Sequence, residues 1–253
     1  MINIIIVSHN NIDDVRTILE ELAGKSDNFR FWVRDNVNDN ALREVCKAYG
    51  VNYNPALRRE GFAVNNNIVT EHVINSATVA DDDYFLFMNP DAFITLESMN
   101  KLCALLANQD IDMFTIDLYT DKNFSVRDPS IRAFPTLKTF LASFIFDSNK
   151  SIVNRDTMTP DSELDWCASS FFGIKTGIFR KLNGFDSRYF MYCEDVDICY
   201  RAKQKGYKLT YIPQIKGIHY AQKKSKKLFT RNFCWHLKSA VLFLWIKYKL
   251  SRR

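Results

Sequence analysis

The sequence is poor in the residues that interrupt a chain: it has 8 Gly and 6 Pro among 253 residues, and no segment rich in Ser and Gly. This scarcity favours one compact domain over two domains joined by a flexible hinge. Hydrophobic residues make up 47% of the chain and charged residues 25%, which excludes a disordered protein, a collagen and a small disulfide scaffold. The length is ample for a buried core.

The marks of a secreted, metal-clustered or membrane-spanning protein are also missing. The six cysteines form no Cys-x-x-Cys pair and no metal-ligand spacing, so we expect reduced cytosolic thiols. The segment 1–7 has neither the basic region nor the cleavage site of a signal peptide. The longest uninterrupted apolar run, 240–246, is far shorter than the ~20 residues that cross a bilayer. We therefore expect a protein on the cytosolic side of the membrane.

Acidic residues are absent after Asp197. Residues 198–253 contain 15 Lys and Arg, which leaves 19 basic and 29 acidic residues before them and a net charge of −10 there. An acidic body with a basic tail indicates a polyanionic partner, either nucleic acid or an anionic membrane surface. Aromatic residues lie among the lysines at helical spacing from about Leu228, which favours a membrane and no nucleic acid. A packed helix with a solvated face is the plainer alternative.

Apolar patterns predict strands that alternate with helices through the first half of the chain. Such alternation favours an α/β fold with a mainly parallel sheet, in which ligands bind beyond the carboxyl ends of the strands. The expected strands are 2–7, 31–33, 51–53, 84–88 and 113–118, and the expected helices are 12–22, 42–49, 66–77 and 96–107. The second half is less regular, with helices at 137–146, 194–205 and from 228, and a strand at 209–212 that Pro213 ends.

Polar clusters follow three of the expected strands: Ser8-His9-Asn10, Asp35-Asn36 and Asn89-Pro90-Asp91. A carboxylate directly after a buried strand, such as Asp91, can hold a hard divalent cation that also binds phosphates. Taken alone, this tripeptide is more typical of a turn in which Pro fixes φ and Asp bonds its neighbours.

A second acidic candidate is Tyr192-Cys193-Glu194-Asp195-Val196-Asp197. Three carboxylates within four residues repel one another, which raises the proton affinity of at least one and suits a general base. The ordinary alternative is a first helical turn whose acids complement the helix dipole. His219 is a candidate ligand for a metal or a diphosphate, or else a partly exposed His at a strand end. No nucleophile elbow, Walker loop, HExxH or GxGxxG is present, so several large enzyme classes lose support.

Seven short motifs occur in order along the chain. They are Val7-Ser8-His9-Asn10, Arg34-Asp35-Asn36, Gly61-Phe62-Ala63-x-Asn65-Asn66-Asn67, Phe87-Met88-Asn89-Pro90-Asp91, Arg132-x-Phe134-Pro135, Asp165-Trp166-Cys167-Ala168 and Asn183-Gly184-Phe185-Asp186-x-x-Tyr189-Phe190-Met191-Tyr192-Cys193-Glu194-Asp195-x-Asp197. Together they resemble the family 2 glycosyltransferases of the GT-A type, over nearly the whole chain. The resemblance is closer to bacterial rhamnosyltransferases that act on lipid-linked N-acetylglucosamine (GlcNAc) in O-antigen or cell-wall polysaccharide assembly.

The resemblance implies a role for each motif. The N-terminal half would bind a nucleotide-sugar, and Asp91, in a variant of the family's Asp-x-Asp motif, would hold Mg²⁺ or Mn²⁺ on the donor diphosphate. His219 matches a C-terminal His that helps with the metal or diphosphate, and Asp195 would be the base that takes the proton of the acceptor hydroxyl. The implied donor-binding residues are Ser8, Asn10, Asp35, Asn67, Asn89, Asp91 and Arg132, and the implied acceptor-binding residues are Trp166 and Glu194.

The reaction implied is an inverting transfer of L-rhamnose from dTDP-rhamnose to polyprenyl-diphosphate-linked GlcNAc, at the inner face of the cytoplasmic membrane. UDP-galactofuranose or a UDP-hexose as donor is one alternative, and a non-catalytic nucleotide-binding membrane scaffold is another. The implied GT-A domain covers 1–222, with a nucleotide-sugar-binding half at 1–118 and an acceptor and catalytic half at 119–222. A basic amphipathic membrane-associating tail would follow at 223–253.

Overall fold

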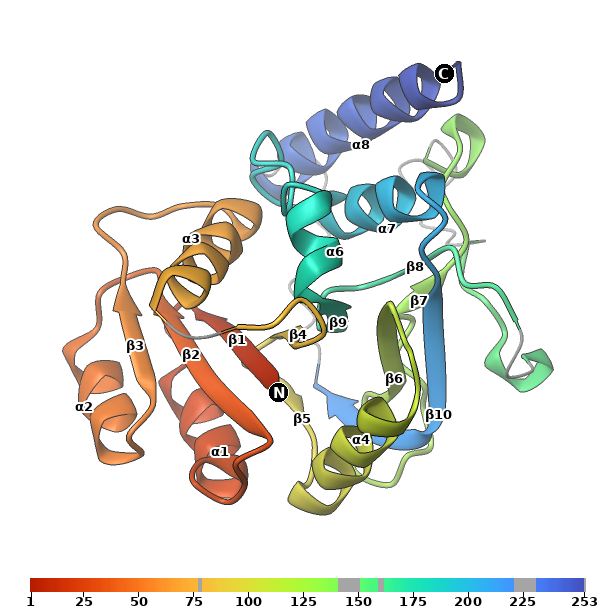
Figure 1. Cartoon of the computed structure of the whole chain (residues 1–253). Helices are drawn as coiled ribbons and strands as arrows, with labels where there is room; N and C mark the ends of the chain where they lie inside the picture. Colours follow the sequence, from red (N-terminus) through yellow and green to blue (C-terminus); the bar gives the residue numbers. More distant parts are fainter. Residues whose placement is uncertain (77–78, 141–150, 159–161, 221–230, 253) are drawn as a thin grey trace.

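An eight-stranded sheet runs through the centre of the molecule, with helices on both faces (Figure 1). The computed structural model describes residues 1–76, 79–140, 151–158, 162–220 and 231–252. The strands of the large sheet, in spatial order, are β3 (Asn52–Pro55), β2 (Phe29–Asp35), β1 (Ile2–Ser8), β4 (Tyr84–Met88), β9 (Phe171–Lys175), β6 (Met113–Tyr119), β10 (Leu209–His219) and β5 (Ala92–Phe93). A second sheet pairs β7 (Ile131–Arg132) with β8 (Trp166–Cys167).

The helices follow the expected alternation in the first half and cluster near the end of the second. They are α1 (Ile12–Leu22), α2 (Asn40–Ala48), α3 (Phe62–Ser76), α4 (Leu96–Asn108), α6 (Thr176–Lys181), α7 (Glu194–Gln204) and α8 (Arg231–Leu250), with a 3₁₀ helix at Arg155–Thr157. The expected α/β fold with a mainly parallel sheet is confirmed.

The first four strands of the chain form one parallel part of the sheet, and β6 and β10 pair in parallel elsewhere in it. β1 pairs in parallel with β2 and β4, and β2 pairs in parallel with β3, so their carboxyl ends share one edge. The β-branched run of β1 is apolar because both of its faces are covered. Ile4 and Ile6 belong to the core formed with α1, α2 and α4, and Ile5 belongs to the core formed with α3.

β9 comes from the second half of the chain and lies antiparallel between β4 and β6. The apolar stretch 171–174 thus enters the sheet beside the strand that precedes Asn89. A side chain at Gly173 would bring its Cβ within 2.1 Å of the Phe114 ring, so the close approach of β9 to β6 requires glycine there. This strand joins the two halves of the chain in a single sheet.

β10 continues to His219, and the expectation that Pro213 ends it is wrong. The pairing of β10 with β6 shifts register between Ile212 and Lys216. Such a bulge accommodates proline, which has no N–H to donate to a neighbouring strand. The continuation beyond the bulge places His219 opposite Ala92 of β5, close to the end of β4 in the chain.

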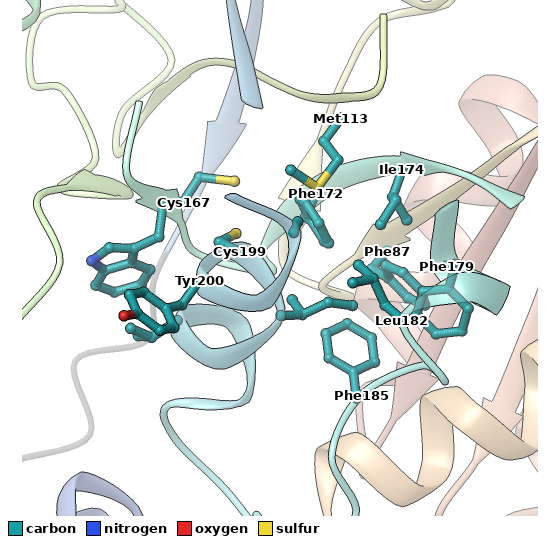
Figure 2. Packing of buried hydrophobic residues seen from close by; sticks show 14 of the residues in the cluster. Phe87, Met113, Cys167, Phe172, Ile174, Phe179, Leu182, Phe185, Cys199 and Tyr200 are labelled. Carbon is teal, nitrogen blue, oxygen red and sulfur yellow. The ribbon is translucent and has the colours of Figure 1, made fainter. Parts of the chain in front are cut away.

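Aromatic side chains fill the core between the sheet and helices α6 and α7 (Figure 2). The Phe87 ring centroid lies 4.8 Å from that of Phe185 and 5.4 Å from that of Phe179. Full burial of one such side chain stabilises the fold by roughly 1.5–3 kcal/mol. The packing of Phe185 holds the turn before α7 against the strand that leads to Asn89.

The C-terminal helix α8 packs against α7 at the periphery of the molecule (Figure 1). Ala240, Phe243 and Ile246 are buried in this contact. No helix in the described part of the chain is long and apolar enough to cross a membrane. The helix expected at 137–146 is helical at 137–140, and its remainder lies outside the described residues, as do the lysines at 223–227.

Candidate active site

The three polar clusters predicted at strand ends lie along one edge of the sheet. β2, β1 and β4 are parallel neighbours, so Asp35, Ser8 and Asn89 lie side by side at or just past their carboxyl ends. The backbone N–H of Asn36 donates to the Ser8 carbonyl over 2.9 Å, which ties two of the clusters together. Asn10 is exposed, and its φ of +64° belongs to the left-handed region that Asn tolerates in turns.

Asp35 is completely buried and holds the loop that follows β2. Its Oδ1 accepts from the backbone N–H groups of Val37 and Asn38 at 3.0 Å each. Its Oδ2 accepts from the N–H of Asp39 at 2.5 Å and from the Tyr53 hydroxyl at 2.7 Å. Burial and the bond to Asp35 raise the pKa of Tyr53 to about 12. These contacts make Asp35 the anchor of the loop, and its contact with a nucleotide stays a prediction.

Asn67 of α3 fastens the turn that precedes the acidic motif. Its Nδ2 donates to the Phe185 carbonyl over 2.7 Å, and its Oδ1 accepts from the Phe185 N–H over 3.0 Å. The neighbouring Gly184 has a φ of +67°, and a Cβ there would lie 2.6 Å from the Asn67 Oδ1. Asn67 therefore sets the distance between α3 and the second half of the chain, and its predicted contact with the donor stays a prediction.

Asp91 and His219 face each other at the end of the sheet. The His219 Nε2 lies 3.4 Å from the Asp91 Oδ1 and 3.4 Å from the Asn89 Nδ2, and its Nδ1 lies 3.1 Å from the Asp128 Oδ2. Burial lowers the pKa of His219, but the two carboxylates together outweigh burial and raise that pKa to about 9. The structure thus brings His219 to Asn89 and Asp91, from which it is far apart in sequence.

This group suits a hard divalent cation that also binds a diphosphate. Asp91 offers a carboxylate oxygen, and His219 offers an imidazole nitrogen once a cation displaces the proton that its raised pKa retains; the two atoms lie close enough to bind one ion. Asp128 holds the other nitrogen of the imidazole, as carboxylates do behind many metal-binding histidines. No group of three or more His, Cys, Asp or Glu is placed to hold a metal among the described residues, which are 1–76, 79–140, 151–158, 162–220 and 231–252. A cation held by Asp91 and His219 would need further oxygen atoms from a bound substrate to complete its coordination.

Asp195 lies in the first turn of α7. Tyr192 and Cys193 directly before the helix have left-handed φ values of +72° and +64°, a conformation that costs energy in residues other than glycine. The Asp195 carboxylate accepts a hydrogen bond from the Val196 N–H at 2.8 Å, and the backbone of Ser169 also favours its ionised form, which lowers its pKa. Burial outweighs these effects and raises the pKa of Asp195. A strained loop and a backbone donor therefore hold this carboxylate in place.

The two neighbouring acids have different surroundings. Glu194 is buried, and burial together with the charge of Asp195 raises its pKa. Its Oε2 accepts no hydrogen bond from any residue that the structure describes. Asp197 is fully buried and pairs with Arg201 at 2.6 Å, although burial still raises the pKa of its carboxyl group. Burial therefore raises the pKa of Glu194 and of Asp195, whereas Asp197 has a structural partner in Arg201.

Two consecutive serines connect the two acidic regions. The backbone of Ser169 favours the ionised form of Asp195 and lowers its pKa, and the carbonyl of Ser170 accepts from the Asn89 N–H over 3.0 Å. Both serine hydroxyls are buried and have no hydrogen-bond partner among the described residues. Consecutive residues of one backbone segment therefore contact Asp195 and the turn that carries Asp91.

Arg132 of β7 brings a positive charge to the same region. The charges of Asp195 and Asp128 favour its protonated form, but burial has the larger effect and lowers the pKa of Arg132. Its guanidinium carbon lies 5.5 Å from the ring centroid of Trp166, on the paired strand β8. The Trp166 indole N–H donates to the Ala133 carbonyl over 2.9 Å, so this buried ring has a fixed orientation beside the site.

Asp128 and the serines are site residues that the sequence analysis does not predict. Asp128 precedes Pro129, a pair typical of ordinary turns, so no motif points to its bond with His219. Ser169 and Ser170 contribute backbone groups, which every residue type except proline possesses. Their place in the site follows from the insertion of β9 beside β4 and has no signature in the sequence.

Comparison with known proteins identifies relatives along the whole chain, although no family profile matches it. The rhamnosyltransferase WbbL of Escherichia coli K12 is 37% identical over 254 residues, which is 100% of this chain and 96% of that protein. The N-acetylglucosaminyl-diphospho-decaprenol L-rhamnosyltransferase of Mycobacterium tuberculosis is 27% identical over 170 residues, 64% of this chain and 55% of that protein.

Solved structures share the fold. The mannosyltransferase PcManGT from Pyrobaculum calidifontis, in complex with GDP-Man and Mn²⁺, has a TM-score of 0.58 at 12% identity, and the match covers 88% of this chain and 58% of that one. Likeness at this identity shows the architecture alone, whereas the match to WbbL extends over both full lengths at 37% identity. The chain therefore belongs to the family 2 glycosyltransferases of the GT-A type, and it is a glycosyltransferase related to bacterial rhamnosyltransferases.

Proposed function

We propose that this glycosyltransferase transfers L-rhamnose from dTDP-rhamnose to GlcNAc linked to a polyprenyl diphosphate, with inversion at the anomeric carbon. The names of two relatives support this choice of substrates. WbbL is a rhamnosyltransferase, and the mycobacterial relative is named for the transfer of L-rhamnose to N-acetylglucosaminyl-diphospho-decaprenol. O-antigen or a related polysaccharide is the product class that this reaction would serve.

The observation that supports the proposal is that Ser169 and Ser170, which are consecutive in the chain, contact Asp195 and the turn that carries Asp91. A single displacement at a sugar carbon needs a group that stabilises the leaving diphosphate and a base that faces the incoming hydroxyl. Two carboxylates at one site, one beside an imidazole and one beside a backbone donor, supply these two functions from different elements. Displacement in one step inverts the anomeric configuration.

Asp195 is the proposed base. Its ionised carboxylate would accept the proton of the GlcNAc hydroxyl as that oxygen attacks the rhamnose carbon. The bond from Val196 orients it, and the raised pKa gives it more affinity for the proton than an exposed carboxylate has. Arg132 would offset the negative charge of the site, because its guanidinium interacts with Asp195.

Asp91 and His219 are the proposed ligands of Mg²⁺ or Mn²⁺, and the diphosphate oxygens of the donor would complete the ion's shell. The ion would stabilise the negative charge that develops on the leaving diphosphate. Asp128 keeps the His219 ring turned so that Nε2 faces Asp91. The Mn²⁺ in the structure of PcManGT supports a divalent ion in this fold.

The remaining predicted residues divide between the two substrates. Ser8, Asn10 and Asp35 would form the wall for the base and ribose, because they lie at the adjoining ends of β1 and β2. Trp166 and Glu194 would line the acceptor side, next to Asp195. We accordingly propose a donor-binding half at 1–118 and an acceptor and catalytic half at 119–222, which share the central sheet. The proposed location is the cytoplasmic face of the inner membrane, where the basic tail at 223–253 would contact the lipid.

A donor screen tests the proposal. The purified chain is incubated with Mg²⁺, a GlcNAc-diphosphate-lipid analogue and, separately, dTDP-rhamnose, UDP-galactofuranose and UDP-hexoses, and the glycolipid mass is measured. We expect a product only with dTDP-rhamnose, with the mass of one added deoxyhexose. A product formed only with a UDP-sugar would identify that sugar nucleotide as the donor in place of dTDP-rhamnose. The absence of turnover with every donor would favour a nucleotide-binding scaffold.

A further inference from the structure

Helix α8 has two apolar faces, of which the inner one holds the segment that precedes Asp195. The Ser239 hydroxyl donates to the Met191 carbonyl over 2.9 Å. The Trp235 ring centroid lies 4.7 Å from that of Phe190, and the rings of His236 and Tyr192 lie 5.0 Å apart. Together with the burial of Phe243, these contacts fix the orientation of α8 on the body of the enzyme.

The outer face of α8 carries four large hydrophobic side chains that are exposed. Leu237, Val241, Trp245 and Tyr248 have exposed fractions of 46%, 61%, 45% and 54%. At 100° per residue these positions fall within about 80° of one another around the helix, so they form one continuous stripe. Scattered exposed apolar residues are normal on a soluble protein, whereas a stripe along one helix marks an interaction surface.

Cations border the stripe and lie against its aromatic rings. The Lys249 Nζ is 3.9 Å from the Trp245 ring centroid, and the Arg252 guanidinium carbon is 4.6 Å from that of Tyr248. Lys238 is exposed on the same side of the helix. The chain has no acidic residue after Asp197, so no negative charge of α8 itself opposes an anionic surface. Aromatic rings together with Lys and Arg are the composition of helices that lie in a membrane interface.

We propose that the outer face of α8, formed by Leu237, Val241, Trp245 and Tyr248, docks on a bilayer surface rich in anionic lipids. The stripe enters the interface, and the bordering cations bind lipid phosphates. This inference deepens the proposed function, whose acceptor lies in a membrane, and it names the surface that does the docking. Because the inner face of α8 holds the loop before Asp195, docking also fixes the orientation of the active site relative to the lipid.

Vesicle flotation tests the inference with the full chain. The double variant Val241→Ser/Trp245→Ser removes the centre of the stripe, and Leu57→Ser/Val126→Ser is the matched control, since Leu57 and Val126 are 102% and 57% exposed elsewhere. We expect the wild type and the control to float with phosphatidylglycerol-containing vesicles and not with phosphatidylcholine alone. Loss of this apolar contact should weaken binding of the stripe variant about tenfold or more.

Two further measurements separate docking from misfolding and from self-association. The stripe variant should keep the wild-type Tm and, if the proposed function holds, wild-type transfer to a water-soluble acceptor analogue. Flotation needs no turnover, so failure of the proposed reaction leaves this test intact. Equal flotation of wild type and stripe variant would overturn the inference, as would a wild type that does not float. A wild-type dimer that the stripe substitutions dissociate, without any lipid binding, would assign the face to a second copy of the chain.

Discussion

Replacement of Asp195 by Asn removes the proposed base and preserves the size of the side chain. The amide has no useful proton affinity, so the acceptor hydroxyl must attack without general-base assistance. Such assistance contributes about 10²–10⁴-fold to a rate, which corresponds to roughly 3–5 kcal/mol of transition-state stabilisation. Because the structure holds Asp195 with a backbone donor, we expect a loss toward the upper end of this range.

Binding of the donor should be nearly unchanged in Asp195→Asn. Asp195 is linked to the Asn89–Asp91 turn through Ser169 and Ser170 and through the charges of Arg132, Asp128 and His219. Because the amide keeps the size of the side chain, we expect the proposed diphosphate site to stay in place. The assay combines transfer from radiolabelled dTDP-rhamnose to the lipid-linked acceptor analogue with calorimetric titration of dTDP. The expected pattern is a large fall in kcat with a donor Kd within about twofold of the wild type, as for an interaction made in the transition state.

Asp197→Asn provides the contrast within the same helix turn. Asp197 is buried and pairs with Arg201, whose side chain is 19% exposed, so removal of this ion pair should lower the stability of the fold. We expect a cost of about 1–3 kcal/mol, which lowers the Tm, with a smaller effect on kcat than Asp195→Asn has. Turnover of Asp195→Asn within about tenfold of the wild type would refute the assignment of the base, as would equal kinetic losses in the two variants.

Three other substitutions test separate parts of the site. Asp91→Ala should lower kcat/KM by about 10²–10³-fold and abolish the dependence of activity on Mg²⁺. Activity is measured over a titration of Mg²⁺, and an unchanged dependence on Mg²⁺ would exclude Asp91 as a ligand. Because Asp195 must be ionised and its pKa is raised, activity should fall as the pH is lowered through values above the usual carboxyl range. Burial and the charge of Asp195 raise the pKa of Glu194 to about 8, so Glu194 is largely neutral where Asp195 titrates. Glu194→Gln should therefore leave that fall at the same pH, whereas a shifted pH profile would show that Glu194 sets it. Ser239→Ala removes the hydrogen bond to the Met191 carbonyl and should lower the Tm by about 2–4 °C. It should also lower kcat several-fold at constant donor KM, whereas an unaltered kcat would limit Ser239 to a structural role.

Local patterns in the sequence determined most of the N-terminal half. The run at 84–88, which is apolar throughout, and the run at 2–7, which is polar only at Asn3, gave strands that are covered on both faces, because buried strands are apolar at nearly every position. Polar residues directly after these runs had to lie at one edge of a parallel sheet, where Ser8, Asp35 and Asn89 are found. The family resemblance added the identities of the nucleotide-sugar enzyme and of its candidate base.

Long-range contacts decided the rest, since periodicity reports only which side of an element is buried and not its partner. The sequence does not show that the segment 171–175 enters the sheet antiparallel beside β4, yet this pairing brings Ser170 to Asn89 and Ser169 to Asp195. Pro213 indicates a strand end locally, but the pairing with β6 absorbs it in a bulge and carries His219 to Asp91. Likewise, an apolar helix near the C-terminus is evident from sequence, whereas only its packing against α7 separates the residues that the protein buries from those that it leaves on the surface.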